Sequence, residues 1–144
     1  MQSTFKKRTR KQALQHILSE FDAGRLGAED GFGGCVYRAV KPEADGTFKH
    51  CAVGCLFNDA QLDDIQTRGL NASSTIDYVA LFVGQKNIEH VTGLDLEELL
   101  HIQRMHDHWL DCAHWDARTF SSKSESQLMA ESKFRTYLIQ NMNG

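Results

Sequence analysis

The chain has 144 residues and a mass of 16.3 kDa, which is the usual size of a single domain. Its 41% hydrophobic and 24% charged residues exclude a disordered chain, and it has no apolar run of about 18 residues that would predict a membrane-spanning helix. A net charge of −3 excludes a uniformly basic nucleic-acid coat.

The first half of the chain is predicted to hold one helix, a glycine-rich loop and a hairpin. Apolar residues at helical spacing (Leu14, Ile17, Leu18, Phe21) predict a helix over residues 9–23, which Gly24 ends. Five glycines between 24 and 34 indicate a loop. The segments 35–40 and 48–53 have strand-like composition, and Asp45-Gly46 between them favours a tight turn.

The second half is predicted to hold four separate helices. Asn58 is expected to begin a helix that runs to about Arg68, and Ser73 or Ser74 to begin another. Asp95-Leu-Glu-Glu98 has the spacing of a capping box, and a last helix is expected at 125–141. The expected fold is α+β: a mostly helical single domain, 1–144, with a small antiparallel β-hairpin at 35–53 packed on helices. Residues 1–8 are expected to be a mobile basic start.

The charge is unevenly distributed along the chain. Residues 1–12 contain five basic residues and no acid, so the remainder carries 11 basic and 19 acidic residues, a balance of −8. Between 87 and 116 seven acids accompany a single arginine, Arg104. This pattern fits either a solvated acidic helix or an electrostatic docking surface. The candidate binding residues are Glu89, Asp95, Glu97, Glu98, Asp107 and Asp111.

Three cysteines cluster around the predicted hairpin and suggest two kinds of chemistry. Zinc would need about four ligands, and Cys35, Cys51, Cys55 and His106 could supply them, although only one pair has the close spacing of structural sites. A thiol enzyme would use Cys51 or Cys55 with His106. Asp107 is a poor candidate to orient His106, because successive helical residues point about 100° apart. The simplest interpretation is that the cysteines are buried small hydrophobes, so we assign no catalytic residue and no cofactor.

Several motifs resemble a family of small phage and prophage proteins of uncharacterised activity. The shared pattern is Cys35-x-Tyr37-Arg38, then Cys51-Ala-Val-Gly-Cys55-Leu56, then Ile102-Gln-Arg-Met-His106-Asp107, and the resemblance covers about residues 12–110. It implies a phage or mobile-element origin and a small accessory protein that acts inside a bacterial cell. Such proteins commonly bind host or defence machinery, anti-CRISPR inhibitors included.

The leading hypothesis is therefore a cytoplasmic, non-enzymatic protein that binds and inhibits a bacterial protein or ribonucleoprotein complex. One alternative is a cysteine-dependent or zinc-containing enzyme using Cys51 or Cys55 and His106. Another is weak nucleic-acid binding through the basic start, which five positive charges would permit without sequence specificity. We expect no membrane association, and direct nucleic-acid binding is not favoured. Trp109 and Trp115 are expected to pack in the core or at its rim.

Overall fold

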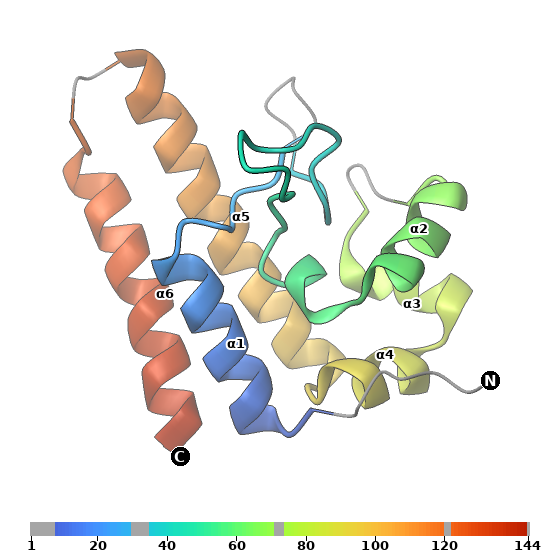
Figure 1. Cartoon of the computed structure of the whole chain (residues 1–144). Coiled ribbons are helices and arrows are strands. Elements are labelled where there is room, and N and C mark those ends of the chain that lie inside the picture. Colours follow the sequence, from blue (N-terminus) through green and yellow to red (C-terminus); the bar gives the residue numbers. More distant parts are fainter. Residues whose placement is uncertain (1–7, 30–34, 71–73, 120–121, 144) are drawn as a thin grey trace.

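The computed structural model describes residues 8–29, 35–70, 74–119 and 122–143. Two groups of helices make up this part of the chain (Figure 1). One side is formed by α1 (Arg10–Asp22), α5 (Leu96–Thr119) and α6 (Glu125–Asn143), which lie side by side. The other side holds the short helices α2 (Asp59–Thr67), α3 (Ile76–Val83) and α4 (Gln85–Thr92). A single 3₁₀ turn, η1 (Gly54–Leu56), lies against α1.

Side-chain caps begin α1, α2 and α5, whereas α3 follows Thr75 without a side-chain cap, so the prediction that Ser73 or Ser74 begins it is wrong. Thr9 and Gln12 form a capping box at the start of α1, and Asn58 and Gln61 form another at the start of α2. Asp95 accepts a hydrogen bond from the backbone N–H of Glu98 at 2.8 Å, which confirms the cap predicted there. Helix α4 was not predicted, because it follows Gly84 without a side-chain cap and has few apolar residues to reveal its period.

The expected α+β fold is wrong, because the described residues contain no strand. The segments of the predicted hairpin do approach each other, through an isolated bridge between Arg38 and His50 and a hydrogen bond from Ala39 N to Lys49 O at 2.8 Å. The turn at Gly46 also forms, with φ at +85°. After Cys51, however, the chain coils into a helical turn, in which Cys55 N donates to Cys51 O at 3.1 Å. The pairing therefore ends before a sheet can develop.

One buried cluster runs through both groups of helices, and its large aromatic side chains meet between α1, α5 and α6. Phe21 of α1 makes edge-to-face contacts with Trp109 of α5 and Phe134 of α6, with ring centroids 5.1 and 5.0 Å apart. Trp109 thus packs as expected. None of the helices in the described ranges has the length and apolar character needed to cross a bilayer.

The basic start falls outside the described residues as far as residue 7. Arg8 and Arg10, which are described, are tied to the body of the protein. Arg8 donates to the carbonyl of Leu56 at 2.6 Å, and Arg10 donates to both carboxylate oxygens of Glu98 at 2.8 and 2.7 Å. Two of the five charges in this region are therefore used inside the protein.

Candidate functional site

A polar cavity of about 110 Å³ lies where the Cys35–Tyr37 segment faces α5. The hydroxyl of Tyr37 donates to Ser74 O at 2.7 Å and accepts from Gln103 Nε2 at 3.2 Å, while Gln103 Oε1 accepts from Ile76 N at 2.9 Å. These groups are satisfied by one another. The lining residues are Cys35, Val36, Tyr37, Cys51, Ser74, Thr75, Gln103 and Asp107.

The thiols of the predicted cluster do not converge on one point. Cys35 and Cys51 both line the polar cavity, and Cys51 Sγ accepts a hydrogen bond from Gly54 N at 3.1 Å. Cys55 is buried and donates its thiol hydrogen to Ala52 O at 3.2 Å. Within the described part of the chain, no group of three or more His, Cys, Asp or Glu residues is placed to hold a metal ion. The geometry gives the zinc alternative no support.

The electrostatic surroundings keep these thiols protonated. Burial raises the pKa of Cys51 to about 12 and raises that of Cys55 well above its ordinary value. For Cys35, burial and the neighbouring Asp107 carboxylate both raise the pKa. Because the thiolate is the reactive form of cysteine, this arrangement suppresses nucleophilic chemistry near neutral pH.

His106 is fully buried and is hydrogen-bonded to its neighbour in the sequence. Its Nδ1 lies 3.0 Å from Asp107 Oδ1, so the expectation that Asp107 is a poor partner is wrong. Nδ1 is the ring nitrogen closer to the backbone, which lets an adjacent short side chain reach it despite the different direction of its Cα–Cβ bond. The other nitrogen, Nε2, is buried and has no hydrogen-bond partner among the described residues.

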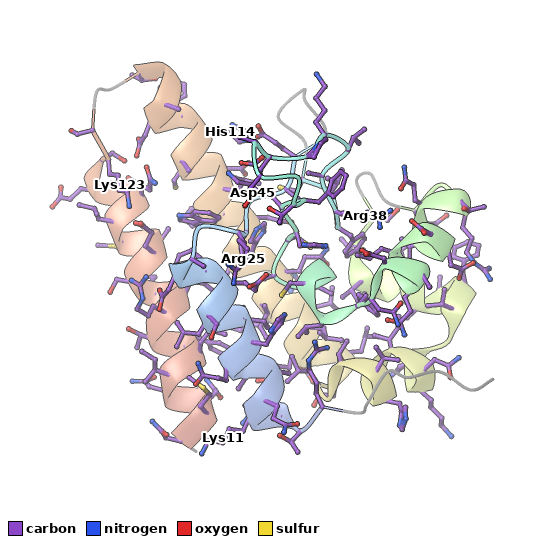
Figure 2. The ribbon with its side chains drawn as sticks, viewed as in Figure 1. Lys11, Arg25, Arg38, Asp45, His114 and Lys123 are labelled. Atoms are coloured by element: carbon purple, nitrogen blue, oxygen red, sulfur yellow. The ribbon has the colours of Figure 1, made fainter. Side chains whose placement is uncertain are left out.

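Among the other histidines of the long helix, His101 and His108 are exposed, whereas His114 is half-buried. His114 is paired with Glu29, which ties the start of the glycine-rich segment to α5 (Figure 2). His108 Nε2 lies 3.9 Å from Cys112 Sγ one helical turn later. Arg38 extends toward α2, where it pairs with Asp59 and Asp63 at 3.3 and 2.6 Å (Figure 2).

The six candidate binding acids do not form one free surface. Glu89 accepts from Leu96 N at 2.8 Å, and Asp95 caps α5. Glu98 is paired with Arg10, and Asp107 with His106. Glu97 and Asp111 are exposed. Four of the six therefore have structural partners. The charge pattern of the sequence predicted more acids free to bind a partner than the structure provides.

A larger groove, of about 490 Å³, lies between the end of α5 and the start of α6. Trp115 is 58% exposed at this groove, so it does not pack in the core. Asp116 is only 4% exposed, and its Oδ2 accepts from Ser124 N at 2.8 Å and from Ser124 Oγ at 2.9 Å. The lining residues are His108, Asp111, Cys112, Trp115, Asp116, Ser124, Glu125 and Ser126.

Sequence reasoning named Asp111 as a binding residue but missed the rest of this groove. Glu125 reaches it only because α6 folds back beside α5. The available signal was local: an aromatic residue at 115 lies one turn after Asp111 and next to Asp116, close to the end of a long helix.

A second exposed surface is the outer face of α3. Tyr78, Leu81 and Phe82 are 49%, 79% and 49% exposed, and the two aromatic rings contact each other edge to face at 5.2 Å. The buried face of the same helix carries Ile76 and Val79, as predicted. Apolar residues thus occupy both faces of this short helix.

A scan against protein-family models, a search of curated proteins and a search of solved structures each found no match to this chain.

Proposed function

We propose that this protein is an accessory protein of a phage or mobile element that binds a bacterial host or defence complex and inhibits it by protein–protein contact. The observation that carries the proposal is the α5–α6 groove, defined by the lining residues given above. It combines the hollow shape, exposed aromatic ring and unbalanced charge that are typical of a recognition site.

The charge of the groove indicates what kind of surface would dock there. Asp111, Asp116 and Glu125 line it, and its described lining residues include no lysine or arginine. Three carboxylates in a concave surface raise the local concentration of positive groups and speed their association. A basic surface, such as one that holds nucleic acid in a bacterial complex, is a suitable partner. Occupying that surface would block its normal ligand.

Both alternatives receive less support from the geometry. A thiol enzyme needs an activated cysteine, whereas burial raises the pKa values of Cys51 and Cys55. Nucleic-acid binding through the basic start would need free cations, and two of its five, Arg8 and Arg10, already bind Leu56 and Glu98. Binding to a basic protein surface makes neither demand.

The test is affinity capture from a bacterial lysate with matched variants. Wild-type protein and the control Glu97→Gln, which removes an exposed charge of α5 away from the groove lining, are expected to capture the same complex. Asp111→Asn combined with Trp115→Ala is expected to lose it, with circular dichroism confirming that this variant is folded. The activity of the captured complex is then measured with and without an excess of the wild-type protein.

Two results would contradict the proposal. One is equal capture by the wild type and the groove variant. The other is a captured complex whose activity does not change when the protein is added in excess. Capture should also weaken as salt is raised, because the attraction between exposed charges is screened within about 10 Å at 0.1 M salt.

A further inference from the structure

The buried carboxylate of Asp116 is only half satisfied. Oδ2 holds the start of α6 through Ser124, but Oδ1 is buried and has no hydrogen-bond partner among the described residues. A buried carboxylate oxygen without a donor is unfavourable, and native structures usually provide one. Because Asp116 lines the groove, a donor that enters the groove can approach this carboxylate.

The groove also offers a flat aromatic surface beside its carboxylates. Trp115 precedes Asp116 in the sequence and is largely exposed. Asp111 lies one helical turn before Trp115, and Glu125 comes from the first turn of α6. The site therefore provides a ring face for stacking and several carboxylate oxygens as acceptors.

The partial charge of α6 does not reverse this preference. A helix N-terminus carries about half a positive charge, which by itself would favour an anion. Here Ser124 Oγ already accepts a hydrogen bond from Gln127 N in the first turn, at 3.2 Å, and Asp116 accepts one from the N–H of Ser124 just before the helix. Three carboxylates outweigh the remaining partial charge, so the groove favours a cation.

The form of the site favours a planar organic cation over a metal ion or an ammonium. No set of metal-ligating side chains converges in the described residues. A lysine ammonium is compact and strongly hydrated, whereas a guanidinium is planar, weakly hydrated and has five donors. It can stack on an indole ring and at the same time donate to carboxylates on either side.

We infer that the α5–α6 groove receives an arginine side chain of the partner protein, whose guanidinium stacks on Trp115 and donates to Asp111, Glu125 and the unpartnered oxygen of Asp116. This inference rests on the proposed function, because it specifies the chemistry of the partner at the same groove. Asp116 Oδ1 is itself buried, so this contact requires the groups around it to move when the arginine binds.

The test uses the full chain and short peptides observed by ¹⁵N NMR. The probes are acetyl-Gly-Arg-Gly-amide and the same peptide with lysine or with citrulline, which keeps the shape of arginine but has no charge. The arginine peptide is expected to shift the indole N–H of Trp115 and the backbone N–H of Ser124 in a saturable way. The lysine peptide should bind about fivefold more weakly, and the citrulline peptide should produce no shift.

Matched variants locate the contact. Asp116→Asn keeps an oxygen that can cap α6 but removes the charge, and it should weaken arginine-peptide binding about tenfold. Glu97→Gln should leave the binding unchanged. The indole signals are assigned with Trp115→Phe.

Three results would overturn the arginine assignment. The first is the absence of a shift at Trp115 with about 10 mM arginine peptide, a concentration at which weak single-residue contacts are detectable. The others are binding of the citrulline peptide, or of the lysine peptide, as tight as that of the arginine peptide. Any of these, together with partner capture that still depends on the groove, refutes the arginine assignment and leaves the proposed function standing. Capture that survives the groove substitutions refutes the proposed function whatever the peptides do.

Discussion

At the scale of single residues, Gly54 shows how closely the chain packs where η1 meets the Tyr37 backbone. A Cβ atom at residue 54 would lie 2.0 Å from the carbonyl oxygen of Tyr37 and 2.8 Å from its carbonyl carbon. Both obstructing atoms belong to the backbone, so a side chain cannot simply rotate away. Position 54 therefore requires glycine for steric reasons.

Gly54→Ala is predicted to lower the free energy of unfolding by about 3 kcal/mol, because the new methyl group must displace backbone. The control is Gly46→Ala, where φ is +85° but nothing lies within 4 Å of the added Cβ. That change should cost about 1 kcal/mol, from backbone strain alone. Urea unfolding measures both values, and equal losses would contradict the close packing at Gly54.

A second prediction for a single residue concerns Cys51 and the free energy of unfolding at alkaline pH. Its pKa rises from an ordinary value of 9.0 to about 12 in the folded protein, chiefly because of burial. Above pH 9.0 the unfolded chain therefore loses the thiol proton while the folded protein keeps it. The stabilising contribution is complete below that pH and is lost as the pH rises toward about 12.

Cys51→Ser is predicted to reduce this alkaline loss of stability by up to about 1.4 kcal/mol per pH unit, since serine does not titrate there. The serine hydroxyl can still accept the hydrogen bond from Gly54 N. Urea unfolding of both proteins across this pH range gives the slopes. Parallel curves would show that Cys51 ionises in the folded protein as easily as in the unfolded chain.

At the scale of elements, Glu98 joins three helices. Its carboxylate accepts from Arg10 of α1 and, at 2.7 Å, from the Tyr137 hydroxyl of α6. Burial alone would raise the pKa of Glu98, but these hydrogen bonds outweigh it and lower the pKa below its ordinary value of 4.5. Its stabilising contribution is present above that value and is lost as the pH falls through the lowered pKa.

Glu98→Gln is predicted to reduce the free energy of unfolding near neutral pH, because it removes the charge that attracts Arg10. The reduction should be only about 1 kcal/mol, because the Arg10 side chain is partly solvated and water screens the attraction. Glu97→Gln, a change of an exposed neighbour, should alter it by less than about 0.5 kcal/mol. The gap between wild type and Glu98→Gln should close in acid. A gap that stays constant with pH would show that the ion pair does not contribute.

The elements also show how far local sequence predicts this fold. The starts of α1, α2 and α5 follow from side chains within three residues of the cap, so the sequence contains the whole signal. The hairpin prediction failed because it depended on strand-like composition, whereas Cys51 to Leu56 coil instead. Arg10 and Glu98 are 88 residues apart, and no local pattern predicts their contact.

At the scale of the whole molecule, the α5–α6 groove exists only because α6 folds back along α5. Asp111 could be selected from the sequence as part of an acidic stretch, but its partners across the groove could not. The packing of α1 and α6 on α5 likewise engages Glu98, through Arg10 and Tyr137, whereas Glu89 and Asp95 are engaged by backbone N–H groups close to them in the sequence. Tertiary structure therefore decides which acids are available to a partner.

The central claim, that the protein acts by docking this groove on a bacterial partner, is tested most directly by site-specific photo-crosslinking. A benzoyl-phenylalanine probe is placed at Ser126, which lines the groove and leaves Trp115 in place, and separately at Glu97 and at Phe82 on the exposed face of α3. After illumination in a bacterial lysate, we predict one major adduct from position 126, none from position 97, and loss of the adduct when Asp111→Asn is added. No adduct from position 126, or an adduct only from position 82, would contradict the claim.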